Sequence, residues 1–332
     1  MNVALIGAGN NASGHAKSLA QIEGIQIVGV ADPIEEKASA LAGEVGANSF
    51  TDHKKMLDSV KPDAVWISSP CWLHPDHTVD CAGAGAHVMC EKPMALSMTD
   101  CDRMIAAARD NGVKLAIGQS TRYAPALLEV KRIFESGQCG DLVTSWSIRM
   151  SYHKPQPHAP WRMDGEKSGG IVFEWEVHEI DFIRSLGGKV SDVYARTAYS
   201  RDDAPNFLDH FSAILTFESG GYGNLEASQS CTLGPGGRGF VGTKGSAQTS
   251  GRDTVQVKIN EMDEVQIVQV PPDPHAERGF GRQTQNVDFI RAIREDDVSP
   301  IPGEDGRANI EIGLAIIESG KTGDVVRLPL SS

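Results

Sequence analysis

The sequence predicts an α/β protein: a doubly wound parallel sheet of the Rossmann type, followed by an α/β domain with a large, mostly antiparallel open sheet. Short strands that are apolar on both faces alternate with helical stretches in the first third of the chain, whereas later strands are apolar on one face only. The 332 residues also exceed the roughly 250–300 at which a single core stops growing. We therefore expect two domains, residues 1–121 and 122–332, without a low-complexity linker.

The first domain contains five expected strands, each paired with a helical stretch. The strands are expected at Val3–Ile6, Ile25–Val30, Ala64–Ile67, His87–Cys90 and Lys114–Ile117. The helices are expected near Asn11–Ile22, Pro33–Ala42, Asp52–Val60, Asp76–Gly83 and Met98–Asn111. Ser97 with Asp100 predicts the start of the last helix, and Asn111-Gly112 predicts its end. Repeated strand–helix units of this kind indicate a doubly wound sheet.

The second domain shows alternation with a period of two. After an expected helix at Ala124–Glu135, alternate residues between His210 and Phe217 are apolar, and Gly220-Gly221 predicts a hairpin turn into a strand at Tyr222–Ala227. Alternation returns in a final set of residues, which is Val255, Val257, Ile259, Val265 and Ile267. Two closing helices are expected near Gln285–Arg294 and Asp305–Ser319, with Gly320 following the second.

Composition and charge limit the possible partners. The net charge of -13 argues against nucleic acid and anionic membranes, and the acidic residues are expected to form a solvated surface. Neither a signal peptide nor a membrane-spanning apolar run is recognised, so we expect a cytoplasmic protein. The six cysteines form no metal-binding or disulfide pattern and are expected to be buried or half-buried thiols. Pro75 interrupts the His74–His77 pair, so no metal site is expected.

A glycine turn and a later carboxylate predict a dinucleotide site. The first strand runs into G-x-G-x-x-A, in which Gly7 permits the turn, Gly9 admits the pyrophosphate and Ala12 allows close helix packing. Asp32 ends the second strand, where a carboxylate accepts hydrogen bonds from the ribose hydroxyls and repels a 2′-phosphate. The acidic residues that follow offer no cation for that phosphate. These features favour NAD over NADP.

Two further segments carry side chains suited to hydride-transfer chemistry. Lys92 lies in Glu91-Lys92-Pro93, at the carboxyl end of a strand, where α/β sheets place their ligands. If Gly169–Asp181 is read as a helix, Glu174 and His178 lie one turn apart on the same face, which is suited to a general base oriented by a carboxylate. Taken alone, Lys92 is also compatible with a surface lysine, and the Glu174–His178 pair with a solvated ion pair.

The order of the motifs resembles the glucose–fructose oxidoreductase / inositol dehydrogenase / MocA-like family of NAD(P)-dependent oxidoreductases. The resemblance covers nearly the whole chain and rests on Gly7 to His15, Asp32, Ser69-Pro70-x-x-x-His74, Glu91-Lys92-Pro93, Trp161-Arg162, Gly169–Asp181, Gly242–Gly245 and Glu318–Gly323. It implies a second domain whose open sheet packs cofactor and substrate on one side and often a partner subunit on the other. A homodimer or homotetramer formed through this sheet is therefore expected.

The resemblance also implies roles for individual residues. His178 would remove the proton of a substrate hydroxyl, and Lys92 would bind the reacting oxygen. Glu174 would be a third catalytic residue, as the carboxylate that orients His178. The expected cofactor contacts are Gly7, Gly9, Asn10, Asn11, Ala12, Asp32, Ser69, Pro70, His74, Glu91, Lys92, Gln119, Trp161 and Arg162. The expected substrate contacts are Lys92, Arg122, Tyr123, His153, Trp161, Arg162, Glu174 and His178. Glu174, Glu176 and Cys71 replace the Asp, Gly and Asn that are common in the family, so the shape of the substrate pocket stays open.

The expected substrate is a sugar, a glycoside or an inositol-like polyol. Aromatic and hydrogen-bonding side chains between Tyr152 and Arg162 suit a ring with one apolar face and polar edges, although a proline-rich surface loop fits the same pattern. Two alternatives to a dehydrogenase stay open. One is an NAD-retaining hydrolase or lyase that oxidises a sugar carbon only transiently, and the other is a dinucleotide-sensing regulator without catalytic activity.

Overall fold

The computed structural model describes residues 1–156, 158–234, 236–271 and 281–330, which divide into two units. The first unit contains Met1–Gln119 and Arg282–Ala308, and the second contains the described residues of Ser120–Gly281 and Asn309–Ser332. A single boundary near residue 121 therefore does not describe the chain, because a segment beyond residue 281 returns to the first unit. The reason is packing: the helix in this segment carries Phe289 and Ile290, which are fully buried in the core of the first unit.

The first unit contains a six-stranded sheet in which all neighbouring strands are parallel. The strand order is β3 (Asn48–Phe50), β2 (Gln26–Ala31), β1 (Asn2–Ile6), β4 (Ala64–Ile67), β5 (His87–Glu91) and β6 (Leu115–Gly118). The five strands expected from the sequence are confirmed, each to within one residue at either end. β3 was not predicted from the sequence, because this strand has only three residues and they are too polar to form an apolar run.

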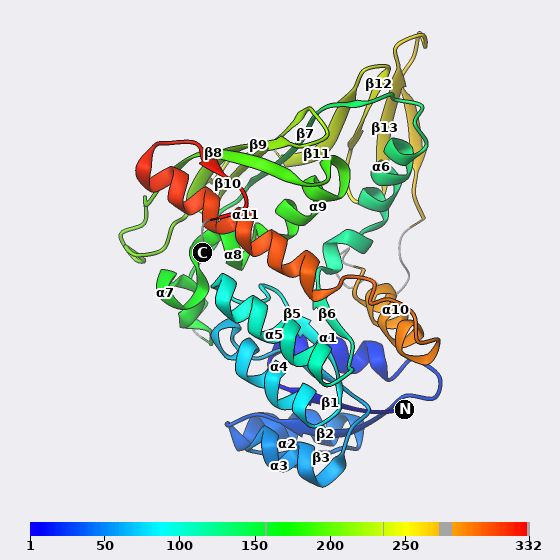
Figure 1. Ribbon diagram of the computed structural model, residues 1–332, viewed down its shortest axis with the longest axis vertical. Coiled ribbons are helices and arrows are strands. Elements are labelled where there is room, and N and C mark those ends of the chain that lie inside the picture. The colour runs from blue at the N-terminus through cyan, green and yellow to red at the C-terminus, as the bar shows by residue number, and fades with distance from the viewer. Residues whose placement is uncertain (157, 235, 272–280, 331–332) are drawn as a thin grey trace. The chain divides into compact units, whose positions relative to one another are not determined.

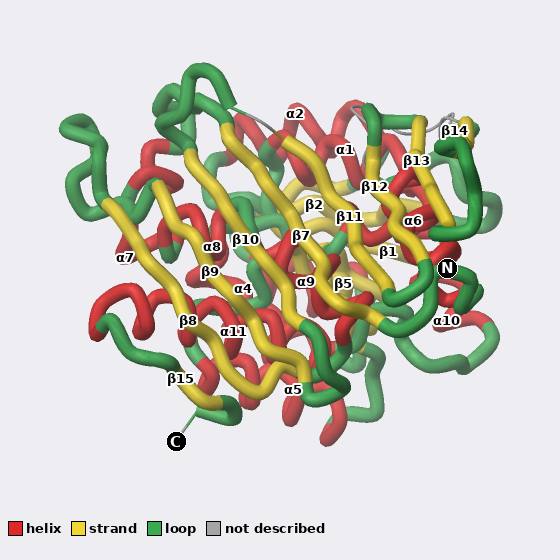
Figure 2. Tube along the Cα trace, turned by 90° about the horizontal axis from the view of Figure 1, so that it is seen from above, coloured by secondary structure: helices red, strands yellow, loops and turns green. Residues whose placement is uncertain are grey.

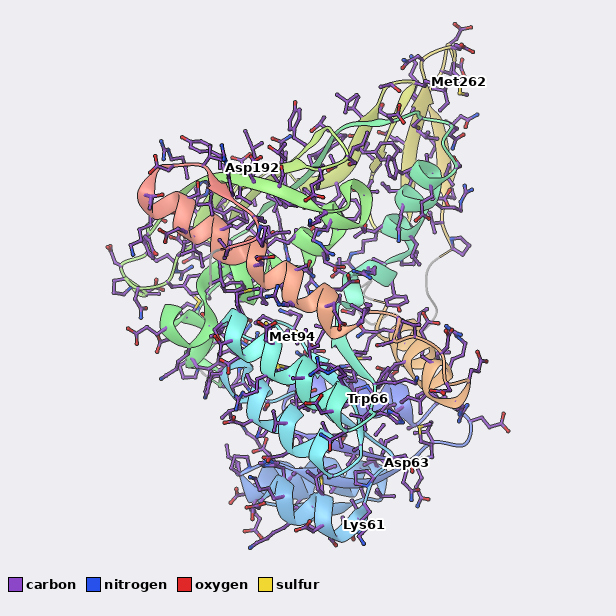
Figure 3. The ribbon with its side chains drawn as sticks, viewed as in Figure 1. Lys61, Asp63, Trp66, Met94, Asp192 and Met262 are labelled. Carbon is purple, nitrogen blue, oxygen red and sulfur yellow. The ribbon has the colours of Figure 1, made fainter. Side chains whose placement is uncertain are left out.

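Helices cover both faces of this sheet (Figure 1). They are α1 (Asn10–Leu19), α2 (Glu35–Val45), α3 (His53–Val60), α4 (His74–Gly83), α5 (Met98–Asp110) and α10 (Arg282–Arg294). The core on one face combines residues of α1, α2 and α10 with alternate strand residues, including Trp66, which is labelled in Figure 3. The expected start of α5 is confirmed, because the Ser97 hydroxyl accepts the Asp100 amide hydrogen at 3.1 Å.

The second unit is built on a nine-stranded mixed sheet, whose strands lie side by side in Figure 2. The order is β14 (Gln266–Gln269), β13 (Thr254–Ile259), β12 (Gly245–Thr249), β11 (Gly236–Gly242), β7 (Leu142–Met150), β10 (Tyr222–Ser228), β9 (His210–Phe217), β8 (Val190–Ala198) and β15 (Val326–Arg327). β7 and β10 are parallel, and the other neighbours are antiparallel. The predicted hairpin at Gly220-Gly221 is confirmed, because β9 pairs with β10 across it.

Helices cover one face of the second sheet. The helices of this unit are α6 (Pro125–Glu135), α7 (Gly165–Ser168), α8 (Gly170–Glu174), α9 (Val177–Gly187) and the larger part of α11 (Gly303–Thr322), which begins in the first unit. The prediction that Gly320 follows the last helix is wrong. α11 continues to Thr322 and ends at Gly323, which has a φ of +81°. Gly320 is instead a contact point, where an added Cβ would lie 2.3 Å from the Thr197 side chain.

The other face of this sheet carries exposed apolar side chains. Ile214, Tyr222 and Val241 share this face by their strand registers, and each is more than a third exposed. The six cysteines are free thiols, five buried and Cys231 half-buried, as predicted. Among the helices of the described chain, none has the length and apolar composition that crossing a bilayer requires.

Candidate functional site

The glycine turn of the first unit forms an open cradle at the start of α1. Gly7 has a φ of +91°, and an added Cβ would lie 2.8 Å from the Ser68 carbonyl carbon, so only glycine fits there. Gly9 precedes the first turn of α1, and a Cβ built on it would meet nothing within 4 Å. The fold itself therefore leaves room at Gly9, which fits the approach of a dinucleotide pyrophosphate to the helix N-terminus.

The packing residues of this turn behave as the motif predicts. Ala12 is completely buried in the core beneath α1. Asn10 and Asn11 open the helix, where their backbone N–H groups have no partner within the helix. The contacts predicted for both asparagines with the cofactor stay predictions.

Asp32 lies directly after β2, half-buried, beside the glycine turn. Its Oδ2 accepts the Ala8 amide hydrogen at 2.8 Å, and its Oδ1 accepts the Ile34 amide hydrogen at 2.9 Å. Each carboxylate oxygen has further lone pairs and can accept more hydrogen bonds. Asp32 is therefore both a brace for the turn and an acceptor suited to ribose hydroxyls.

His74 connects two loops at the carboxyl edge of the same sheet. Its Nδ1 lies 2.8 Å from the Pro93 carbonyl oxygen, and its Nε2 lies 2.9 Å from the Ser69 carbonyl oxygen. Burial lowers the pKa of His74. Ser69 also bonds through its hydroxyl to His77, at 2.9 Å. His74 thus holds the Ser69-Pro70 loop against the loop after β5, and its predicted contact with the cofactor stays a prediction.

The Glu91-Lys92-Pro93 segment begins in β5 and continues beyond it. Glu91 is buried and lies 2.9 Å from His15, and its other carboxylate oxygen accepts the Lys92 amide hydrogen at 3.2 Å. Burial alone would raise the pKa of Glu91, but the hydrogen bond and charge of His15 lower it to about 2, helped by the charges of Arg282 and Lys92. Lys92 is half-buried, and Gln119 is buried just beyond β6. The ionised Glu91 therefore anchors the backbone of Lys92.

The predicted single helix through Glu174 and His178 is wrong. α8 ends at Glu174 and α9 begins at Val177, with Trp175 at φ −124° between them. The two residues therefore do not lie on one continuous helix. Glu174, which is 3% exposed, forms an ion pair with Arg162. His178 is the second residue of α9 and is half-buried.

Arg149 of β7 contacts residues on both sides of the break between α8 and α9. Its guanidinium lies 4.7 Å from the centre of the Trp175 ring and donates to the Trp175 carbonyl oxygen at 3.3 Å. It also lies 3.7 Å from the carboxylates of Glu176 and Glu179. Since Trp175 precedes the break and Glu179 follows it, Arg149 helps to fix the start of α9, where His178 lies.

Glu179 is the centre of a buried ionic cluster beneath the sheet. Arg238 binds it through two nitrogens, and the Ser147 hydroxyl donates to it at 2.8 Å. Burial alone would raise the pKa of Glu179, but the charges of Arg238 and Arg149 and these hydrogen bonds lower it to about 2. Glu176 lies at the edge of the same cluster, 3.7 Å from Arg149.

Arg122 forms an ion pair with a carboxylate of α9. It donates to both carboxylate oxygens of the buried Asp181, at 2.8 and 2.6 Å, and Asn309 donates to the same carboxylate at 2.9 Å. Asp181 lies one turn after His178. Substrate binding by Arg122 and Tyr123 stays a prediction, and the structure gives Arg122 a clear role in fixing the position of α9.

Aromatic and cationic side chains pair in the loop predicted to bind substrate. The His153 ring lies 4.1 Å from the Trp175 ring, centre to centre, and burial with the nearby charges of Arg149 and Arg201 lowers the pKa of His153. Arg162 lies over the Trp161 ring at 4.8 Å. Aromatic faces beside charged groups are therefore present in this loop. No group of three or more His, Cys, Asp or Glu side chains in the described chain could hold a metal ion.

Two residues that shape these sites were not predicted. Arg149 lies on β7, whose residues show no clear alternation of apolar and polar side chains. Asn286 lies in α10 and bonds to His15 and Trp66 at 3.1 and 2.9 Å. The sequence of α10 does mark Asn286, because a polar residue on the same helix face as Phe289 and Ile290 is a candidate for a buried hydrogen bond.

Family models match both parts of the chain. A model described as "Oxidoreductase family, NAD-binding Rossmann fold" matches residues 1–119, and a "GFO/IDH/MocA C-terminal domain" model matches residues 127–248. The first domain is therefore an NAD-binding Rossmann domain, as predicted.

Individual relatives match over different lengths. Myo-inositol 2-dehydrogenase of Thermotoga maritima is 26% identical over 96% of each chain. The 2,7-anhydro-N-acetylneuraminate hydratase of Mediterraneibacter gnavus is 29% identical over 58% of this chain and 51% of that protein. A levoglucosan dehydrogenase structure, in complex with NADH and levoglucosan, has a TM-score of 0.91 at 23% identity, covering 99% of this chain and all of that one.

Proposed function

The chain belongs to the Gfo/Idh/MocA family of NAD-binding oxidoreductases, and from that premise we propose that it oxidises a secondary hydroxyl of a sugar, glycoside or inositol-like cyclic polyol. The observation that carries the proposal lies within the first unit. The Gly9 cradle follows β1 and the Lys92 turn follows β5 of one parallel sheet, so both lie at its carboxyl edge, where such sheets bind ligands. The names of the inositol and levoglucosan dehydrogenases support a polyhydroxylated substrate.

In the proposed reaction, the hydrogen of the hydroxyl group leaves as a proton and the hydrogen of the same carbon leaves as a hydride. His178 takes the hydroxyl proton as a general base, while Lys92 donates a hydrogen bond to the oxygen that becomes a carbonyl. Bound NAD supplies the acceptor for the hydride that leaves the carbon. Arg149 and Arg122 hold α9, and Glu91 holds the Lys92 backbone, so each proposed catalytic group has a fixed support within its own unit.

The test combines a substrate panel with two variants. The purified protein should produce NADH from NAD with at least one member of a polyol and sugar panel, measured by absorbance. Lys92→Ala and His178→Ala should each abolish turnover while the affinity for NAD stays near that of the parent. Lys189→Ala and His53→Ala, on side chains paired with Glu218 and Asp80, are matched controls that should keep full activity. Full activity of either test variant would contradict the role of that residue.

A second candidate function is suggested by the hydratase relative. In it the same Lys92 and His178 would serve transient oxidation of a sugar carbon, followed by elimination or addition at a neighbouring position and return of the hydride. This reaction yields product without net NADH. Chromatography of the reaction mixture beside the absorbance trace separates the two functions, because only the dehydrogenase forms NADH in proportion to product.

We also propose that the protein forms a homodimer or homotetramer through the exposed face of the second sheet. Ile214, Tyr222 and Val241 support this, because an apolar sheet face in water favours association with a second surface. Light scattering should show a dimer or tetramer, and Ile214→Lys should shift it towards the monomer. A parent protein that is monomeric at micromolar concentration would contradict the proposal.

A further inference from the structure

A buried polar network lies directly behind the Lys92 turn. His15 of α1 is 1% exposed and contacts Glu91 of β5 through Nε2, at 2.9 Å, and Asn286 of α10 through Nδ1, at 3.1 Å. Asn286 is completely buried and also contacts Trp66 of β4 and Ser18 of α1, at 2.9 and 2.8 Å. All of these residues belong to the first unit. Four elements, α1, β4, β5 and α10, therefore meet behind one loop.

The donors in this network fix the position of one proton. The indole nitrogen of Trp66 can only donate, so the Asn286 atom that it contacts is the amide oxygen. Because the same oxygen contacts Nδ1 of His15, that ring nitrogen must also donate, and Nδ1 carries a hydrogen. The amide nitrogen of Asn286 is accounted for by its bond to the Ser18 hydroxyl.

The other ring nitrogen of His15 requires a second proton. Nε2 faces a Glu91 carboxylate oxygen at 2.9 Å, and without a hydrogen between them two lone pairs would face each other in a buried place. Besides His15, Glu91 faces two positive charges, Arg282 on α10 and its own neighbour Lys92. His74 of α4 also lies near Glu91, but burial lowers the pKa of His74, so it is not counted among these charges. These charges favour the carboxylate, so the second proton belongs to His15.

We propose that His15 and Asn286 are positioning residues for Lys92, and that His15 acts as an imidazolium ion held in that form by Asn286. His15 pairs with one Glu91 oxygen, and the other Glu91 oxygen accepts the Lys92 amide hydrogen, so the imidazolium fixes the backbone that carries Lys92. It also balances the charge of Glu91 next to the Lys92 ammonium. The inference rests on the proposed function, because it assigns to Lys92 the role given above.

The network also explains why the chain returns to the first unit. α10 lies more than 160 residues beyond β6, yet it supplies the acceptor that His15 and Trp66 share. A hydrophobic residue at position 286 would fill the space and leave two buried donors without an acceptor, which is unfavourable. α10 therefore adds a polar contact to the Lys92 turn as well as apolar area to the core.

The first measurement reads the proton and does not depend on activity. Nitrogen NMR of the ¹⁵N-histidine-labelled parent, without substrate and near neutral pH, should show both His15 ring nitrogens carrying hydrogen. His15→Gln identifies the signals by their loss, and His53→Gln, which removes another histidine–carboxylate pair of the same unit, is the matched control. A spectrum in which Nε2 of His15 has no hydrogen would overturn the proposal, whether or not a substrate has been found.

The second measurement reads the effect on Lys92. His15→Gln keeps a donor for Glu91 but removes the charge, so kcat should fall about 10- to 100-fold while the affinity for NAD stays within about twofold of the parent. The uncompensated Glu91 should hold the Lys92 proton more firmly, moving the alkaline limb of the kcat–pH profile to higher pH. Asn286→Asp, which keeps an acceptor for His15 and Trp66, should retain more activity than Asn286→Leu.

The outcomes separate positioning from simple stability. Thermal unfolding of every variant is followed by circular dichroism. A His15→Gln protein that is folded but unchanged in both kcat and its pH profile would overturn the proposal. So would Asn286→Asp and Asn286→Leu proteins of equal activity. If the parent turns over no panel member, the proposed function fails, while the NMR result still decides the charge of His15.

Discussion

The two units place their functional side chains by different means. In the first unit, Lys92 follows a parallel strand buried between helix layers, and its position is fixed by the strand end and the Glu91–His15 pair. In the second unit, His178 opens a helix that begins after a break, and its position is fixed by the ion pairs of Arg149, Arg238 and Arg122 with buried carboxylates. The comparison teaches that a strand end can be recognised in a sequence, whereas a helix held by distant ion pairs cannot.

The largest expected effect concerns the ionic cluster of the second unit. Glu179→Leu leaves the Arg238 guanidinium without its buried partner, and breaking a buried pair in this way costs about 3–5 kcal/mol. Urea unfolding should show a loss of this size. Glu218→Gln, at an exposed ion pair with Lys189, should leave the free energy of unfolding unchanged within error. Equal stabilities of the two variants would show that the cluster contributes nothing.

Lowering the pH should destabilise both units of the protein. Glu91 and Glu179 have a pKa of about 2 in the folded protein, below the usual 4.5, so each contributes stability that is complete above about pH 4.5. This stability should disappear as the pH falls from about 4.5 towards 2. Urea midpoints measured across that range should decline in the parent and decline less steeply in Glu91→Gln. A variant profile parallel to that of the parent would argue against the ionised Glu91.

Substitutions of the two glycines in the nucleotide turn should distinguish a loss of stability from a loss of NAD affinity. Gly7→Ala forces a side chain against Ser68 at a positive φ, so both stability and NAD affinity should fall. Gly9→Ala meets open space, so the thermal midpoint should stay near that of the parent while NAD binds about tenfold or more weakly, because the methyl group occupies the cradle. Calorimetry with NAD measures both. Unchanged NAD affinity in Gly9→Ala would contradict the cradle.

The smallest expected effect concerns the choice of cofactor. Asp32 accepts hydrogen bonds from the Ala8 and Ile34 amides, and we expect its carboxylate to repel a 2′-phosphate. Asp32→Ser should narrow the preference for NAD over NADP by about tenfold, because the like-charge repulsion is removed. The ratio of kcat/KM for the two cofactors gives the result. Equal use of NAD and NADP by the parent would contradict the role of Asp32 directly.

Much of the fold could be predicted because its signals are local. The apolar strands of the first sheet, the glycine turn, the start of α5 at Ser97 and the hairpin at Gly220-Gly221 depend on neighbouring residues, and all were identified. The break at Trp175 was missed, and Arg149, which contacts it, lies 26 residues earlier on a strand that gave no clear alternation. The helix face of Asn286 marks it as a candidate for a buried hydrogen bond, but its partner His15, 271 residues away, could not be predicted. Long-range polar contacts have no periodicity to reveal them.

The central claim is hydride transfer from a hydroxyl-bearing carbon to NAD with Lys92 and His178 handling the hydroxyl. The most direct measurement uses a substrate from the panel with deuterium at that carbon, followed by mass spectrometry of the nucleotide. The proposal predicts one deuterium in each NADH formed and a slower turnover than with the unlabelled substrate. Product that accumulates without NADH, or NADH that contains no deuterium, would contradict it.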